Sequence, residues 1–219
     1  MNKRRANQKL RSKADLDKGL LNRPWHSKAY HRHFEGYTEV ETVNPKGKVV
    51  IQRIYTGDYF RLDLPRNKRI GLRVVYVFLW LIACALFGFA ASRPIGANMT
   101  WYLAIVQMLT VCALAGVLFS LISHCTAPRD MTIGDWKSAS VNLKRRAVYA
   151  ALFLELNAFA TGVYLLLKGD RWGAHLLVIV LYVLSGLLLV VMNRMEDNAP
   201  YLTVPNAQPA PPEGSYIDA

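Results

Sequence analysis

The chain has 219 residues, of which 53% are apolar and 19% are charged, and its formal net charge at pH 7 is +12. The apolar residues gather in four long runs, which excludes an ordinary soluble domain with a dispersed core and favours membrane spans. The excess of basic over acidic residues favours anionic partners, above all lipid head groups.

Residues 1–33 form a basic arm that carries ten Lys or Arg against two acidic residues. The arm has few apolar side chains to bury, so we expect it to be disordered and cytoplasmic. Anionic lipid attracts such an arm by about 1 kcal/mol per basic residue near the surface, which makes lipid the preferred partner. Nucleic acid is disfavoured because no aromatic platform or binding motif accompanies the charge. We expect His26, His31 and His33 to be solvated rather than to bind zinc.

Residues 34–65 are predicted to form a small cytoplasmic β-hairpin. The segments YTEVETV and VVIQRIYTGDYF have the alternating or β-branched character of strands, and NPKGK between them is typical of a turn. Two strands alone are marginal in water, so the hairpin needs support from the membrane surface, from the loop at 126–146 or from another protein. Its exposed edge could also pair with a partner strand.

Residues 66–194 are predicted to form a four-helix transmembrane domain. Its spans, at about 70–92, 101–124, 147–167 and 172–193, are long enough to cross roughly 30 Å of hydrocarbon at about 1.5 Å per residue. The link from Lys168 to Arg171 is so short that the last two spans must be antiparallel neighbours. We therefore expect an all-α membrane protein made of two antiparallel helical hairpins. In the longer connection, Ser138 or Ser140 is expected to cap the helix that enters the third span.

The distribution of basic residues predicts the orientation of the spans. Twelve Lys or Arg flank the spans on one side and three on the other, which places both termini in the cytoplasm of a cell whose inner or plasma membrane holds the protein. Trp101, Tyr102, Tyr164 and Trp172 would then lie at the outer interface, where aromatic rings are favoured. The basic anchors expected to face lipid head groups are Arg66, Lys68, Arg69, Lys144, Arg145 and Arg146.

Glu155 is the residue most indicative of function. It stands eight positions into the third run, about 12 Å deep at helical rise, where an unpaired acid is costly. Small residues at helical spacing from it predict that it faces inward against another helix. Hydrogen-bond donors at similar depth on the neighbouring spans are Ser120, Tyr182 and Ser185.

Two interpretations of Glu155 remain open. It could bind a cation or cycle a proton, as acids within spans do in transporters. It could instead be a neutral or hydrogen-bonded acid that holds the bundle together. We favour the second, because a proton or ion pathway needs several polar residues and the spans offer few.

The remaining features indicate packing or disorder rather than chemistry. Cys84 and Cys112 each begin a stripe of small residues, and they are expected to be free thiols that pack helices rather than metal ligands. Asn98 opens a glycosylation sequon, which we discount because it lies against the membrane. The tail at 195–219 contains five prolines and no Lys or Arg, so we expect it to be disordered and cytoplasmic.

The sequence contains no recognisable catalytic motif, so we assign no catalytic residue, metal or cofactor. The leading prediction is a non-enzymatic accessory or interaction subunit that binds anionic lipid and either a protein partner or further copies of itself. The alternative is a component of an ion- or proton-coupled transporter or channel that uses Glu155. A third hypothesis is a membrane enzyme that acts on lipid head groups, and its candidate site is the region from His26 to His33.

Overall fold

The computed structural model describes residues 35–43, 49–169 and 172–206, and these are mostly helical. The chain divides into two compact units. We call the described residues 35–43, 49–61, 129–134 and 202–206 the strand unit, and the rest the helical unit. The predicted basic arm and the last residues of the predicted tail lie outside the described residues.

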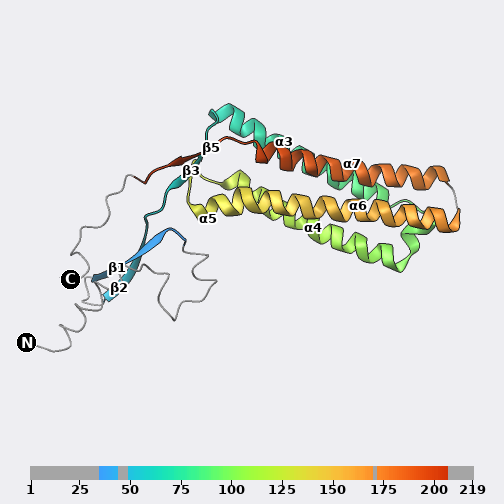
Figure 1. Ribbon diagram of the computed structural model, residues 1–219, viewed down its shortest axis with the longest axis horizontal. Coiled ribbons are helices and arrows are strands. Elements are labelled where there is room, and N and C mark those ends of the chain that lie inside the picture. The colour runs from blue at the N-terminus through green and yellow to red at the C-terminus, as the bar shows by residue number, and fades with distance from the viewer. Residues whose placement is uncertain (1–34, 44–48, 170–171, 207–219) are drawn as a thin grey trace, which may run out of the picture. The chain divides into compact units, whose positions relative to one another are not determined.

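The strand unit begins with a pair of strands. Strand β1 (Tyr37–Val43) pairs antiparallel with β2 (Val49–Tyr55), with Tyr37 opposite Tyr55 and Val43 opposite Val49 (Figure 1). The pairing confirms the two predicted strands, and the predicted turn at 44–48 lies outside the described residues. The second strand ends earlier than the sequence suggested, because the amides of Thr56 and Gly57 both donate to the carbonyl of Gly36 and turn the chain.

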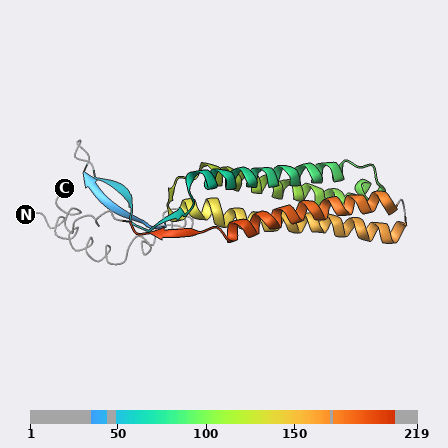
Figure 2. The same ribbon diagram turned by 90° about the horizontal axis from the view of Figure 1, so that it is seen from above.

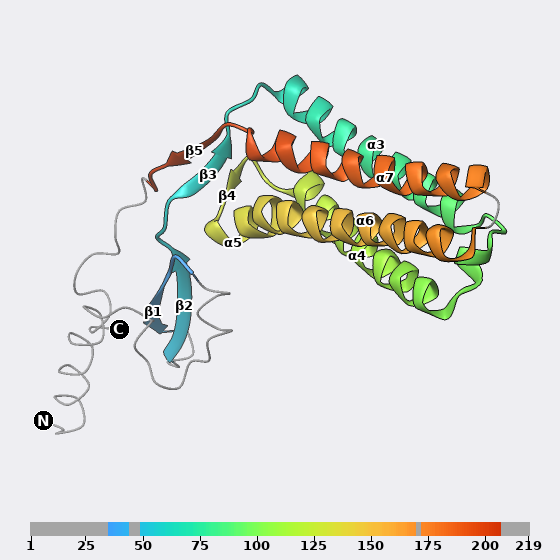
Figure 3. The same ribbon diagram turned by 45° about the vertical axis from the view of Figure 1, so that its right-hand side comes forward.

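A second sheet was not predicted. Strand β3 (Tyr59–Leu62) lies between β4 (Asp130–Met131) and β5 (Tyr201–Val204), in the order β4-β3-β5 (Figure 3). Phe60 pairs with Met131, and Arg61 pairs with Asp130. Strands of two to four residues have too few positions for a period-2 pattern to appear, so β4 and β5 could not be predicted from their residues alone.

Tyr55 is the centre of the strand unit and is only 8% exposed. The rings of Tyr37 and Tyr59 lie 5.1 and 5.0 Å from its ring centroid, and its hydroxyl accepts a hydrogen bond from the amide of Ile133 at 3.0 Å. Gly36 lies against the same ring with φ of +82°, and a Cβ there would stand 2.8 Å from the ring. Only glycine meets both requirements without strain.

The helical unit contains α3 (Arg66–Ala91), α4 (Trp101–Thr126), α6 (Asn142–Lys168) and α7 (Trp172–Asp197), with the short helical turn η2 (Gly96–Met99) between α3 and α4. α7 packs on α3 and α6, and α6 also packs on α4 (Figures 1 and 2). All four helices are long and apolar enough to cross a membrane.

The third of these helices begins before the predicted boundary. A short helix α5 (Ile133–Trp136) and a π-helical turn η3 (Lys137–Val141) lead without a break into α6. Ser138 and Ser140 lie inside this turn, so the prediction that either caps the helix is wrong. The polar residues of this segment had indicated a loop, but it is packed against α4 and α6, and packing outweighs local propensity.

The beginning of the predicted disordered tail is ordered. Helix α7 continues to Asp197, and residues 201–204 form β5. The amide of Asp63 donates to the carbonyl of Pro200, and the Tyr201 hydroxyl donates to Glu196. These bonds fix a segment that its prolines and polarity alone would leave disordered.

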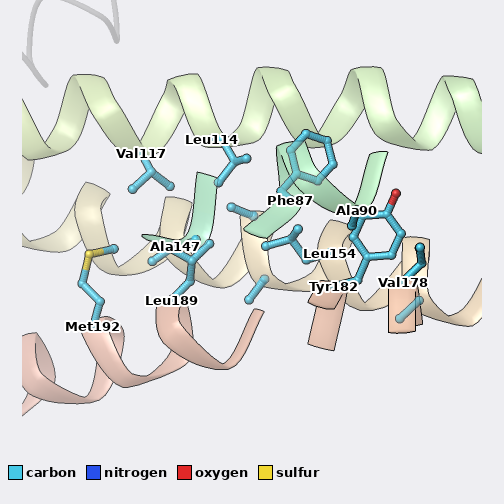
Figure 4. Packing of buried hydrophobic residues seen from close by; sticks show 14 of the residues in the cluster. Phe87, Ala90, Leu114, Val117, Ala147, Leu154, Val178, Tyr182, Leu189 and Met192 are labelled. Atoms are coloured by element: carbon cyan, nitrogen blue, oxygen red, sulfur yellow. The ribbon is translucent and has the colours of Figure 1, made fainter. Parts of the chain in front are cut away.

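The core of the helical unit is made of aliphatic and aromatic side chains that point into the space between the helices (Figure 4). Leu154 of α6 and Leu189 of α7 are fully buried there, as is Tyr182. Alanines on α6 keep the helix axes close; they are Ala147, Ala150, Ala151 and Ala158.

Candidate functional site

Glu155 does not face the interior of the helical unit, so the prediction of an inward carboxyl is wrong. Its side chain is exposed on α6 and lies over Gly186 of α7, where a Cβ would be 2.6 Å from its Oε1. Within the described part of the chain, Glu155 makes no hydrogen bond or ion pair. The small residues that suggested an inward face are indeed at the α6 and α7 contact, but Glu155 stands at its outer edge.

The three donors predicted for Glu155 are engaged elsewhere. The Ser185 hydroxyl donates to the carbonyl of Ala83 at 2.7 Å, and the Tyr182 hydroxyl accepts from Nε2 of Gln107 at 3.0 Å. Ser120 is buried, and its hydroxyl has no hydrogen-bond partner among the described residues. The structure therefore does not bring the predicted polar site together.

A second acid, Glu196, is buried at the end of α7 and is only 2% exposed. The hydroxyl of Tyr76 on α3 donates to its Oε2 at 3.0 Å, and the hydroxyl of Tyr201 donates to its Oε1 at 2.7 Å. The ring of His124 on α4 lies 5.3 Å from the ring of Tyr76. We call Glu196, Tyr76, Tyr201 and His124 the Glu196 cluster.

Helix α5 and the π-helical turn η3 close this cluster. The Nδ1 of His124 is 3.3 Å from the carbonyl oxygen of Ala139, and the ring of Trp136 meets that of Tyr201 edge-on at 6.4 Å. Burial, together with the neighbouring Glu196, raises the pKa of Tyr201 above its ordinary value. Tyr201 therefore stays protonated and remains a donor to the carboxylate at physiological pH. π-helical turns are frequent at functional positions.

Sequence reasoning missed the Glu196 cluster because MNRMED looked like the polar end of a span. A signal was available: Ser185, Leu189, Met192 and Glu196 follow one another at steps of three and four residues, so Glu196 continues the buried face of α7. Tyr76 and His124 carried no sequence signal that linked them to it.

The predicted basic anchors fall into two groups. Arg66, Lys68 and Arg145 are exposed, and Lys144 forms an ion pair with Asp197 at 3.0 Å. Arg69 is half-buried, and Arg146 donates from Nη1 to the carbonyl of Gly116 on α4 at 2.9 Å. Arg146 therefore joins two helices, where the sequence predicted a side chain facing head groups.

The described residues contain no group of three or more His, Cys, Asp or Glu that could hold a metal ion. Cys84 and Cys125 are half-buried free thiols, and Cys112 is exposed.

Comparison with known proteins gives no match to a family model, a curated protein or a solved structure.

Proposed function

We propose that the protein is a multi-pass protein of the cell membrane, with its helices inserted as two antiparallel hairpins and both termini cytoplasmic. In this role it acts as a non-enzymatic accessory or interaction subunit that binds anionic lipid and a protein partner. The features that support this are the apolar outer faces of the four helices, the bias of basic residues and the position of Glu155.

The position of Glu155 is the observation that carries the proposal. In a bilayer its outward carboxyl would meet hydrocarbon, where translocon measurements place the cost of an acid at about 2.5 to 3.5 kcal/mol. A protein that covers this face and hydrogen-bonds the carboxyl removes most of that cost. Two interior polar side chains of α6 near this depth already have local partners: Asn157 donates to Thr110 at 2.7 Å, and the Thr161 hydroxyl donates to the carbonyl of Asn157 at 2.8 Å.

Lipid binding is supported by the exposed basic side chains at one end of the helical unit. Helices α3 and α6 begin at this end, and Arg66, Lys68 and Arg145 are exposed there. Head groups of anionic lipids would contact these side chains on the cytoplasmic face. Lys144 contributes less, because its charge is already paired with Asp197.

The membrane part of the proposal is tested with tags at both ends of the chain. We expect the protein to stay in the membrane after sodium carbonate extraction, and both tags to be protected from protease in intact cells. Both tags should become digestible in inverted vesicles. A soluble chain, or a tag cleaved in intact cells, would overturn the proposal.

The accessory role is tested by light scattering in mild detergent together with solute flux in liposomes. We expect a protein mass above that of one 24.7 kDa chain and no flux. A monomer that transports a solute by itself would contradict the proposal.

A coupled transporter or channel component remains the second candidate, and the absence of a partner for Glu155 within the described chain is what favours it. An ion or proton pathway past Glu155 would lie on the outer face of the helical unit, so other subunits would have to enclose it. Under this alternative, Glu155→Gln abolishes ion- or proton-driven flux of the assembled complex without changing its amount in the membrane. Unchanged flux excludes it.

The third hypothesis was a membrane enzyme that acts on lipid head groups. Its candidate site, His26 to His33, lies outside the described residues.

A further inference from the structure

Two arginines continue the buried face of α3 to the start of that helix. Arg69 and Arg73 precede the fully buried Tyr76 at steps of four and three residues, so all three lie on one side of α3. Both arginines are half-buried. The apolar run of α3 begins at Ile70, so the pair lies at the boundary between this run and the polar end of the helix.

The guanidinium groups of this arginine pair have few partners within the chain. Nη2 of Arg73 donates to the carbonyl of Ala127 at 2.9 Å, which anchors this side chain at the end of α4. Arg69 forms no side-chain hydrogen bond or ion pair within the described residues. The Nε atoms of both arginines are buried and have no hydrogen-bond partner among those residues. Because an unpaired buried donor on a charged group is costly, both guanidinium groups need an acceptor that the described chain does not supply.

Glu196, the buried acid near this end of α3, does not balance the charge of the pair. Glu196 and Arg73 both lie near Tyr201, but each oxygen of the carboxylate already accepts a hydrogen bond from a phenol. A full charge on Glu196 offsets only one of the two guanidinium groups. Two like charges four residues apart on one helix face repel each other. An anion that bonds to both arginines removes this repulsion.

We infer that Arg69 and Arg73 bind the phosphate group of an anionic phospholipid. Guanidinium groups match phosphate oxygens in geometry and form short, charge-assisted hydrogen bonds with them. A lipid fits better than a free anion, because Ile70 and Val74 directly follow the two arginines, are 47% and 46% exposed, and offer apolar contact to an acyl chain. The inference rests on the membrane insertion and lipid binding proposed above, and it adds a defined site to them.

This site differs from the exposed basic side chains at the same end of the helical unit. Arg66 and Lys68 are exposed, so salt screens their attraction to head groups. The half-buried pair is screened less, and the bond to Ala127 restricts the motion of Arg73. We therefore expect one lipid to bind the pair more tightly than lipids bind the exposed side chains.

Native mass spectrometry of the full chain in detergent tests the site, with phosphatidylglycerol and phosphatidylcholine as the added lipids. We expect the native chain to bind its first phosphatidylglycerol about tenfold more tightly than phosphatidylcholine. Arg69→Gln should remove most of this difference, and it breaks no bond within the described chain. The matched control is Lys68→Gln, which removes the same charge from the adjacent exposed position. We expect Lys68→Gln to weaken binding by about twofold, because exposed charges contribute little.

Equal losses in the two variants would overturn the inference, because overall charge alone would then explain the binding. Full retention of phosphatidylglycerol by Arg69→Gln would also overturn it. In both cases the native preference for phosphatidylglycerol persists, so the lipid binding of the proposed function stands. A native chain that binds both lipids equally would contradict that lipid binding together with this site.

Inorganic phosphate distinguishes a lipid from a free anion as the ligand. We expect phosphatidylglycerol to raise the thermal unfolding midpoint of the native chain in detergent more than that of Arg69→Gln. Inorganic phosphate at the same concentration should raise neither midpoint and should not displace bound phosphatidylglycerol. Displacement by inorganic phosphate would show that the pair binds a free anion, and it would overturn the assignment of a lipid.

Discussion

The hydroxyl of Tyr76 donates a hydrogen bond of 3.0 Å to Oε2 of Glu196, although 120 residues separate them in the chain. The bond joins α3 to the last turn of α7 at a point where both side chains are buried. Tyr201 completes the arrangement by donating to Oε1, so each oxygen of the carboxylate has a phenolic donor. A buried acid with two donors can remain in place without a basic partner.

Removal of either phenol should destabilise the helical unit. Tyr76→Phe leaves Oε2 of Glu196 buried without its donor, and we expect a loss of about 1 to 3 kcal/mol of unfolding free energy. Thermal or denaturant unfolding in detergent measures it. The control is Tyr149→Phe, because Tyr149 is exposed and should change little. Equal stability of the two variants would show that the bond contributes nothing.

The four long helices could be predicted because runs of more than twenty apolar residues have few alternative structures. The rotation of each helix about its own axis could not be predicted. Ala151 and Ala158 indicated which side of α6 meets another helix, but Glu155 is on the border of that side, and a difference of a few tens of degrees separates an inward from an outward carboxyl.

The polar contacts at the ends of the helices were harder to predict than the spans. Glu196 could have been found by extending the buried face of α7 by one more turn. Its partners could not, because Tyr76 and Tyr201 meet it only after four helices have packed and the chain has turned at Pro200. Long-range contacts of this kind leave no local pattern in a single sequence.

The Arg61 and Asp130 pair should make the strand unit sensitive to acid. Their side chains join β3 to β4 at 2.5 Å, and the Arg61 guanidinium lowers the pKa of Asp130 below its ordinary value. Because the folded pKa is the lower one, the pair stabilises fully above the ordinary carboxyl pKa, and this stabilisation is lost as the pH falls through the lowered value.

Hydrogen-exchange protection of the β3 and β4 amides, corrected for intrinsic rates, measures the effect between pH 7 and pH 2. We expect a small loss in the native chain, since both side chains are more than a third exposed to screening solvent. We expect the Asp130→Asn variant to have, already at pH 7, the lower protection that the native chain reaches at pH 2. Its protection should not change with pH. A native chain without pH dependence would contradict the role of the pair.

Gly36 is expected to tolerate no larger residue. Gly36→Ala places a Cβ 2.8 Å from the Tyr55 ring at a φ of +82°, so we expect a loss of about 1 to 3 kcal/mol in the local stability of the strand unit. The opposite result is expected for Gly71→Ala, whose Cβ meets nothing within 4 Å in the interior of α3 and should stabilise that helix by about 0.5 to 1 kcal/mol. Hydrogen exchange resolved by segment separates the two effects. If both variants changed local stability in the same direction and by a similar amount, the contact with Tyr55 could not be the cause of the loss in Gly36→Ala.

Asn98 should stabilise the connection between α3 and α4. Its Nδ2 lies 2.9 to 3.2 Å from three carbonyl oxygens, those of Ala90, Ala91 and Arg93, and shares its two hydrogens among them. Its Oδ1 accepts from Gln107 at 3.1 Å. The carbonyl of Ala91, the last residue of α3, has this amide as its donor, and an apolar environment would otherwise leave it unpaired. The same amide nitrogen is the atom that a glycan would have to occupy.

Asn98→Ala leaves the carbonyl of Ala91 without a donor, whereas those of Ala90 and Arg93 keep the amides of Arg93 and Ile95. We expect a loss of about 1 to 3 kcal/mol in unfolding free energy, measured by thermal unfolding in detergent. Ser92→Ala at the end of the same helix is the control, because Ser92 is exposed and makes a single bond to the carbonyl of Phe89. We expect that change to stay within about 0.5 kcal/mol. If Asn98→Ala were as stable as Ser92→Ala, water or lipid head groups would have replaced the amide, and the connection would lie at a hydrated depth.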